Sequence, residues 1–131
     1  MSENFLTMRL LVGRYGICRL NSNDLIPEWV YKSSFLSVTR TMDELSIVCN
    51  EESIPNNIKC EKEWRVLMVE GPLDFSLIGI LASISKILSQ NRISVFVIST
   101  YDTDYILVKN NAINNAIEAL VSEGYRIVEE R

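Results

Sequence analysis

Two short segments carry the side chains best suited to holding a small charged ligand. The first, Glu70–Ser76, runs from a predicted strand into a predicted helix. The start of a helix presents unpaired N–H groups and partial positive charge, which suits a carboxylate, and a glycine at position 71 lets the backbone approach a ligand closely. Alternatively, the glycine only makes the turn and an acidic or hydroxyl side chain only caps the helix. The candidate ligand-binding residues of this loop are Gly71, Pro72, Leu73, Asp74, Phe75 and Ser76.

The second segment, Ser99–Tyr105, joins two predicted strands and contains several hydroxyls and two carboxylates. An ammonium group on a small ligand needs hydrogen-bond acceptors, which Asp104 or a main-chain carbonyl could supply. The alternative is a solvated hairpin turn whose aspartates make local hydrogen bonds, which is the favoured interpretation for Asp102 at the turn tip. The candidate ligand-binding residues of this turn are Ser99, Thr100, Tyr101 and Asp104.

Catalysis has little support in the sequence. A catalytic pair formed by Asp102 and Asp104 needs one raised pKa in an apolar cleft, which an exposed hairpin does not provide. The sequence has no histidine, the commonest general acid and base. Neither GxxxxGK[ST] nor GxGxxG occurs. We therefore expect no enzyme, no catalytic residue and no cofactor.

The three cysteines, Cys18, Cys49 and Cys60, form no CxxC pair. Without histidine, a zinc site would need unusual help from carboxylates, so no metal site is expected. Reduced, partly buried thiols are the favoured interpretation, and they fit a cytoplasmic location without a disulfide.

Charge and hydropathy restrict the partners. The net charge is -4 and the sequence pI about 4.9, which argues against binding nucleic acid or anionic lipid. The start of the chain has no basic region typical of a signal peptide. The longest nearly apolar run, Leu77–Leu88, is shorter than the roughly 20 residues that cross a bilayer.

The second half of the chain predicts the order βαββαβ. One apolar face recurs at helical spacing in each helical segment, and Gly124 is suited to end the second helix. This order is the ferredoxin-like arrangement, with both helices on one face of an antiparallel sheet. The predicted strands are Trp64–Glu70, Ile93–Ser99, Tyr105–Lys109 and Arg126–Glu129, and the helices are Phe75–Gln90 and the segment that follows Asn110 and Asn111.

The first half predicts a reduced version of the same plan, ββαββ. Thr7–Val12 and Ile17–Leu20 are expected to form a hairpin, and a short helical piece begins at Pro27. The segments FLSVTRT and LSIVCN are expected to form a second hairpin. Polar residues 50–63 are expected to connect the halves. We therefore expect an α+β protein of two units, 1–60 and 61–131.

Residues 70–108, EGPLDFSLIGILASISKILSQNRISVFVISTYDTDYILV, resemble the signature of ACT domains. Residues 35–52, FLSVTRTMDELSIVCNEE, are similar to the first unit of a tandem-ACT subgroup of small bacterial proteins, which is related to the cytosolic arginine sensors of the animal TOR pathway. The ferredoxin-like fold of that family agrees with the element order derived above.

The resemblance implies a regulatory protein that binds a free amino acid, because ACT domains bind amino acids or other small ligands beside the first loop, usually between ACT units. It therefore favours a ligand site over a simple turn and helix cap at residues 71–76. A single tandem pair also implies a homodimer joined through the C-terminal ACT domain. The alternative function is an interaction or dimerisation module that binds no ligand.

Overall fold

The first strand of the chain belongs with the second half of the sequence. The computed structural model describes residues 6–70 and 79–130. Met1–Val12 and Arg65–Arg131 form unit 1, and Gly13–Trp64 form unit 2. The sequence predicted a division after residue 60 with the N-terminal strand in the first unit, so the observed grouping differs in the placement of that strand.

Unit 1 is an α+β sandwich of one mixed sheet and two α-helices. Its described strands run in the order β8-β1-β5-β7-β6 across the sheet. Its elements are β1 (Thr7–Leu10), the second half of β5 (Cys60–Val69), α1 (Ile80–Gln90), β6 (Phe96–Ser99), β7 (Asp104–Lys109), η3 (Asn110–Ala112), α2 (Ile113–Ser122) and β8 (Arg126–Glu129).

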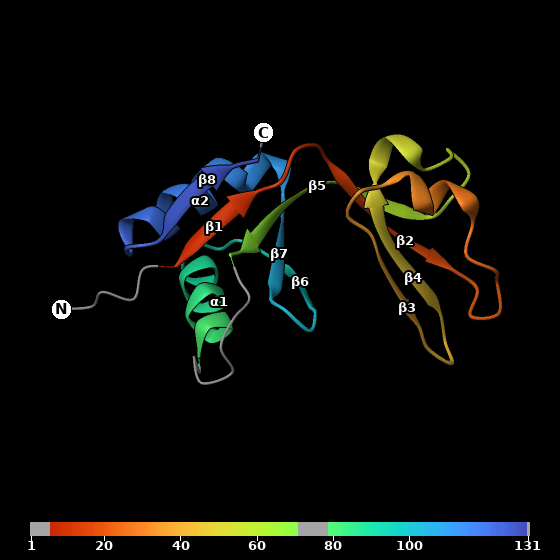
Figure 1. The fold of residues 1–131 in the computed structure, drawn as a ribbon, viewed down its shortest axis with the longest axis horizontal. Helices are drawn as coiled ribbons and strands as arrows, with labels where there is room; N and C mark the ends of the chain where they lie inside the picture. The colour runs from red at the N-terminus through yellow and green to blue at the C-terminus, as the bar shows by residue number, and fades with distance from the viewer. Residues whose placement is uncertain (1–5, 71–78, 131) are drawn as a thin grey trace. The chain divides into compact units, whose positions relative to one another are not determined.

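Strand β1 lies between β5 and β8 (Figure 1). It is antiparallel to β5, where Met8 faces Val69, and parallel to β8, where Met8 faces Ile127. The predicted hairpin between Thr7–Val12 and Ile17–Leu20 is therefore wrong, because the hydrogen bonds of β1 go to these two distant strands. In the four-stranded arrangement that the sequence predicted, β8 would lie beside β5. Here β1 separates them.

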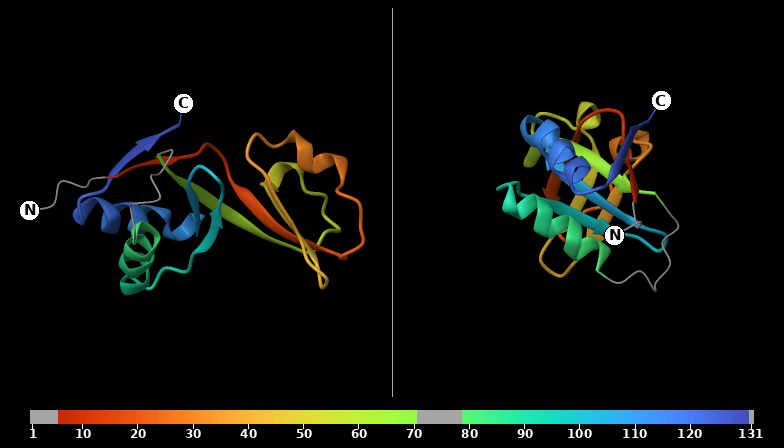
Figure 2. Two further views of the ribbon diagram at one scale, coloured as in Figure 1. Left: turned by 60° about the horizontal axis from the view of Figure 1, so that its bottom comes forward. Right: turned by 90° about the vertical axis from the view of Figure 1, so that its left-hand side faces the viewer.

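The core of unit 1 lies between the sheet and the helices, and Figure 2 shows α1 and α2 on the same side of the sheet. Met8 and Leu10 of β1 enter this core, so the inserted strand contributes buried apolar surface as well as hydrogen bonds. The predicted apolar faces of both helices are confirmed by the side chains that they bury: Ile84, Ile87, Leu88, Ile113, Ala116 and Leu120.

Unit 2 is built on an antiparallel sheet whose described strands run β3-β4-β2-β5. The predicted helical piece is present as a 3₁₀ turn, η1. The place that the N-terminal strand was expected to fill beside β2 is taken by the beginning of β5, which the sequence assigned to a connector. Its elements are β2 (Tyr15–Leu20), η1 (Glu28–Lys32), β3 (Ser37–Arg40), β4 (Leu45–Asn50), η2 (Glu51–Ser53) and the first half of β5.

Strand β5 serves both units because a bulge interrupts it near their boundary. Tyr15 faces Trp64 and Ile17 faces Glu61, so β5 carries one residue more than β2 over this stretch. Glu63 in the bulge has a φ of 69°, in the left-handed region, and its N–H donates to Glu51 Oε1 at 2.8 Å. A bulge resets the alternation of side chains between the two faces.

Among residues 6–70 and 79–130, no helix has the length and apolar character that crossing a membrane requires.

The two α-helices end in the same hydrogen-bond pattern but with different residues in the left-handed position. After α1, Arg92 has a φ of 61° and the Ile93 N–H donates to the Leu88 carbonyl. After α2, Gly124 has a φ of 100° and the Tyr125 N–H donates to the Leu120 carbonyl. Both ends are Schellman motifs, which confirms the predicted role of Gly124.

The two helix ends predict opposite effects on stability when the residue in the left-handed position is substituted. Arg92→Gly should raise the free energy of unfolding by about 0.5–1 kcal/mol, since glycine has no Cβ to strain this conformation. Gly124→Ala should lower it by about 1 kcal/mol for the converse reason. Urea denaturation measures both. Arg92→Ala, which keeps the strain and removes the side chain, is the control and should not reproduce the gain.

Candidate functional site

The turn between β6 and β7 is fixed against the end of β5. The Thr103 Oγ1 hydroxyl donates to the Val69 carbonyl at 2.7 Å, and Thr103 is only 6% exposed. Val69 is the last residue of β5 and lies one residue before the predicted ligand loop begins at Glu70. The turn is therefore held at the end of β5, where Glu70, the described residue of the first segment, follows Val69.

The turn itself is closed by local hydrogen bonds. The Thr100 N–H donates to the Thr103 carbonyl at 2.8 Å, and the Thr100 hydroxyl donates to the same carbonyl at 3.0 Å. Ser99 and Asp104 face each other across the strands, and the Ser99 hydroxyl donates to Asp104 Oδ1 at 2.5 Å. The local hydrogen bonding that the sequence allowed for Asp104 is therefore present.

Asp104 projects to the side of the sheet that the helices cover. Side chains alternate along a strand, and Ile106 and Val108 of the same strand lie in the core between the sheet and the helices. Asp104 shares their face and is half-buried at the rim of that core. The Asp104 carboxylate therefore borders an apolar core while Asp104 remains partly exposed.

The other predicted site residues divide into two groups. Tyr101 is 89% exposed, and Asp102 beside it is exposed at the turn tip, as expected for a solvated turn. The remaining predicted residues, Gly71, Pro72, Leu73, Asp74, Phe75 and Ser76, lie outside the described residues.

Three polar residues at this end of the sheet were missed from the sequence. Thr103 was passed over for its acidic neighbours, although it precedes the apolar Leu107 by four residues and so shares its face by alternation, which was a signal for an inward-facing hydroxyl. Arg9 Nε donates to Glu70 Oε2 at 2.6 Å, with about a third of each side chain exposed. Such an exposed pair contributes little stability, and only the insertion of β1 beside β5 brings it together.

The Asp104 carboxylate is an acceptor at the rim of the core, on the face of the sheet that the helices cover. Arg9 alternates with Met8 and Leu10 of that core, so its guanidinium lies on the opposite face, beside Glu70. In the part of the chain that the structure describes, no group of histidine, cysteine and carboxylate side chains has the geometry to hold a metal ion.

Comparison with known proteins supports the two-part α+β fold described above. The family model of the ACT domain matches residues 59–122, and the model of an N-terminal domain matches residues 13–57. The cytosolic arginine sensor for mTORC1 subunit 1 of Bos taurus is 29% identical over 105 residues, which cover 70% of this chain. The chain spans only 31% of the length of that relative.

Two solved structures share this fold over most of the chain. Protein Atu0741 of Agrobacterium tumefaciens is 37% identical, with a TM-score of 0.91, and the alignment covers 97% of this chain and 95% of that one. The regulatory subunit of aspartate kinase from Thermus thermophilus shares the fold at 7% identity, with a TM-score of 0.57 over 83% of this chain and 90% of that one.

The sandwich of α1 and α2 on one face of a mixed sheet is the ferredoxin-like fold of an ACT domain. The chain belongs to the ACT-domain family and is related to the cytosolic arginine sensors.

The anchor at Thr103 predicts a stability difference between two threonines of one turn. Thr103→Val removes a buried hydroxyl and leaves the Val69 carbonyl without that donor, so the free energy of unfolding should fall by about 1–2 kcal/mol. Thr100→Val, at an exposed position where water replaces the hydroxyl, should change it by less than about 0.5 kcal/mol. Urea denaturation of both variants decides, and equal losses would contradict a specific anchor.

Proposed function

We propose that this chain is a regulatory protein that binds a free amino acid at the end of β5, between the loop at residues 71–76 and the turn at residues 99–104. The observation that supports this proposal is the hydrogen bond from Thr103 to Val69, since it ties that turn to the strand from which the loop departs.

The proposed ligand is recognised through its two charges. Its carboxylate takes N–H groups at the helix start that the sequence predicts near Phe75. Its ammonium faces Asp104. The carboxylate of Asp104 has two oxygens, so it can accept a hydrogen bond from the ammonium group while it also accepts the one from the Ser99 hydroxyl. The ligand's side chain points away from the sheet, where a partner subunit would select it.

Arginine is the first ligand to test, because the curated relative is named as an arginine sensor. That name also favours a cytosolic location for this chain. Because the sequence is acidic, the proposed partners are a small ligand and a second copy of the chain, and not nucleic acid or membranes. No catalytic step is proposed.

A thermal-stability screen with each of the twenty amino acids tests the proposal. A ligand that binds only the native state raises the unfolding midpoint in proportion to the logarithm of its concentration. At least one amino acid should do so. If none does at millimolar concentration, the function without a ligand, an interaction or dimerisation module, takes its place.

Asp104→Asn should weaken binding of the amino acid found in the screen about ten- to hundredfold. The substitution keeps the shape and removes the charge, and a charge-assisted hydrogen bond contributes roughly 1.5–3 kcal/mol. Asp102→Asn is the matched control two residues away and should bind like the parent. Gly71→Val tests close approach of the loop and should also weaken binding. Calorimetric titration measures all three variants, and parent-like binding by a folded Asp104→Asn protein would refute this site.

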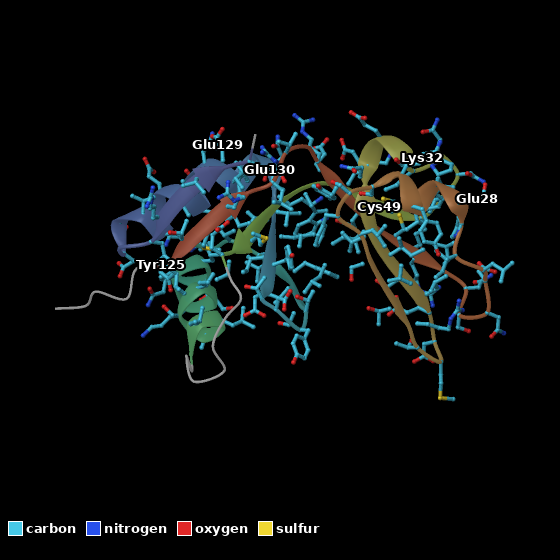
Figure 3. The ribbon with its side chains drawn as sticks, viewed as in Figure 1. Glu28, Lys32, Cys49, Tyr125, Glu129 and Glu130 are labelled. Atoms are coloured by element: carbon cyan, nitrogen blue, oxygen red, sulfur yellow. The ribbon has the colours of Figure 1, made fainter. Side chains whose placement is uncertain are left out.

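The chain should form a homodimer through unit 1, using the edge of β8. Among the described strands β8 pairs with β1 alone. The Arg126 and Glu130 N–H groups point toward β1, so by alternation that of Glu129, which is exposed at the end of β8 (Figure 3), points to the open edge. An open edge of this kind can pair with a second copy.

Sedimentation at micromolar concentration tests the dimer. The parent should sediment at twice the 15.0 kDa chain mass. Glu129→Pro removes the outward donor without touching the pairing with β1, so it should give a folded monomer. Glu129→Ala is the control and should remain dimeric. A parent that sediments as a monomer would contradict the proposal.

A further inference from the structure

The three cysteines, far apart in sequence, converge on one face of the sheet of unit 2. Cys18 lies on β2, Cys49 on β4 and Cys60 on β5, and all three are free thiols. Cys18 and Cys49 are fully buried, whereas Cys60 is half-buried at the margin of the same apolar cluster. Figure 3 shows Cys49 on its strand within this unit.

The absence of a side chain at Gly16 leaves the space that the Cys60 sulfur occupies. Gly16 precedes Cys18 by two residues on the same face, and Cys49 faces it directly on β4. A Cβ atom at Gly16 would lie 2.7 Å from the Cys60 sulfur and 2.5 Å from the Ile54 side chain. Both distances are shorter than real contacts, so the Cys60 sulfur occupies the space that any larger residue at position 16 would need.

Cys18 and Cys60 are direct cross-strand neighbours. The Arg19 N–H donates to the Lys59 carbonyl at 3.0 Å, so Arg19 and Lys59 form the hydrogen-bonded pair and the two cysteines form the adjacent non-hydrogen-bonded pair. In such a pair the Cα atoms are about 4.5 Å apart and the side chains are close. This separation falls within the range of about 4.4–6.8 Å that a disulfide bridges.

Cys49 is placed differently. It faces Gly16 while Cys18 faces Ile47, so Cys49 is the diagonal neighbour of Cys18. Diagonal neighbours are roughly 7–8 Å apart, beyond the reach of a disulfide without movement of the backbone. Its thiol hydrogen-bonds with that of Cys18 instead, and this bond lowers the pKa of Cys49.

We propose that Cys18 and Cys60 are a redox-sensitive pair that a hydroperoxide converts into an intramolecular disulfide, leaving Cys49 as a thiol. Cys60 is the accessible member and reacts first: its sulfur takes one peroxide oxygen, giving a sulfenic acid and releasing an alcohol or water. The Cys18 sulfur then attacks Cys60, the S–S bond forms and water leaves. The two sulfurs lose two electrons in total, and the peroxide O–O bond gains them.

The surroundings of Cys60 set how readily this happens. Burial, followed by the neighbouring Cys18, raises the pKa of the Cys60 thiol to about 12. Glu51 of η2 acts in the same direction, and Lys62 of β5 opposes it. Because the thiolate is the reactive form, the pair stays reduced at neutral pH until peroxide is abundant. The disulfide would join β2 to β5 across the 41 residues between the two cysteines and hold unit 2 closed.

Treatment of the reduced chain with excess hydrogen peroxide tests the pair. The free-thiol count after unfolding should fall from three to one, with a mass loss of two hydrogens, and peptide mapping should join the Cys18 and Cys60 peptides. Dithiothreitol should restore three thiols. A bond that includes Cys49, a bond between chains, or oxygen addition without a crosslink would overturn the proposal.

Three matched variants separate the pair from the third thiol. Cys49→Ala should still lose both of its remaining thiols to peroxide by forming the crosslink, whereas Cys60→Ala should keep two after the same treatment. Cys18→Ala should add oxygen at Cys60 without an intramolecular crosslink. Because the Cys18 site is fully buried and that variant can fail to fold, Cys60→Ala and the mapped crosslink of the parent chain carry the test. The rate of disulfide formation should rise about tenfold per pH unit between pH 7 and 10. A plateau near pH 8.5–9 would show that an ordinary thiol reacts first.

Discussion

The insertion of β1 between β5 and β8 is the constraint on which the rest of unit 1 depends. A strand that enters the middle of a sheet satisfies hydrogen bonds on both of its sides, and Met8 and Leu10 add buried apolar surface to the core under the helices. Without β1, the facing edges of β5 and β8 would both lose their partners. Unit 1 is therefore not a continuous stretch of sequence, since one of its interior strands comes from the N-terminus and the rest from the second half.

The same insertion shapes the end of the sheet where a ligand is proposed to bind. It brings Arg9 beside Glu70 at the exit of β5, while Thr103 fastens the β6–β7 turn to Val69 on the other side of that strand. The end of β5 is thus held by hydrogen bonds from both neighbours. Polar groups fixed in this way lose little conformational freedom when a ligand binds, which is the physical basis of a preorganised site.

Strand β5 contributes residues to both units. Its first half places Cys60 beside Cys18 in unit 2, and its second half leads to the candidate ligand site in unit 1. The bulge at Glu63 lets one strand meet two different sets of neighbours, because an extra residue changes which side chains face each core. The left-handed conformation that this requires of a glutamate is supported by the hydrogen bond of its N–H to Glu51.

The sequence by itself determined the elements whose signals are local. Helical spacing of Ile84, Ile87 and Leu88, the glycine that ends α2, and the alternation in β7 depend on residues close in the chain, and a resemblance in residues 70–108 was enough to predict the ferredoxin-like fold. Tertiary structure alone decided which strands pair: β1 with β5 and β8, and β5 with β2. It also decided that Thr103 meets Val69 and that three widely spaced cysteines share one face. Strand pairing joins residues distant in sequence, and an apolar alternating segment is compatible with many partners, so its choice depends on the whole folded chain.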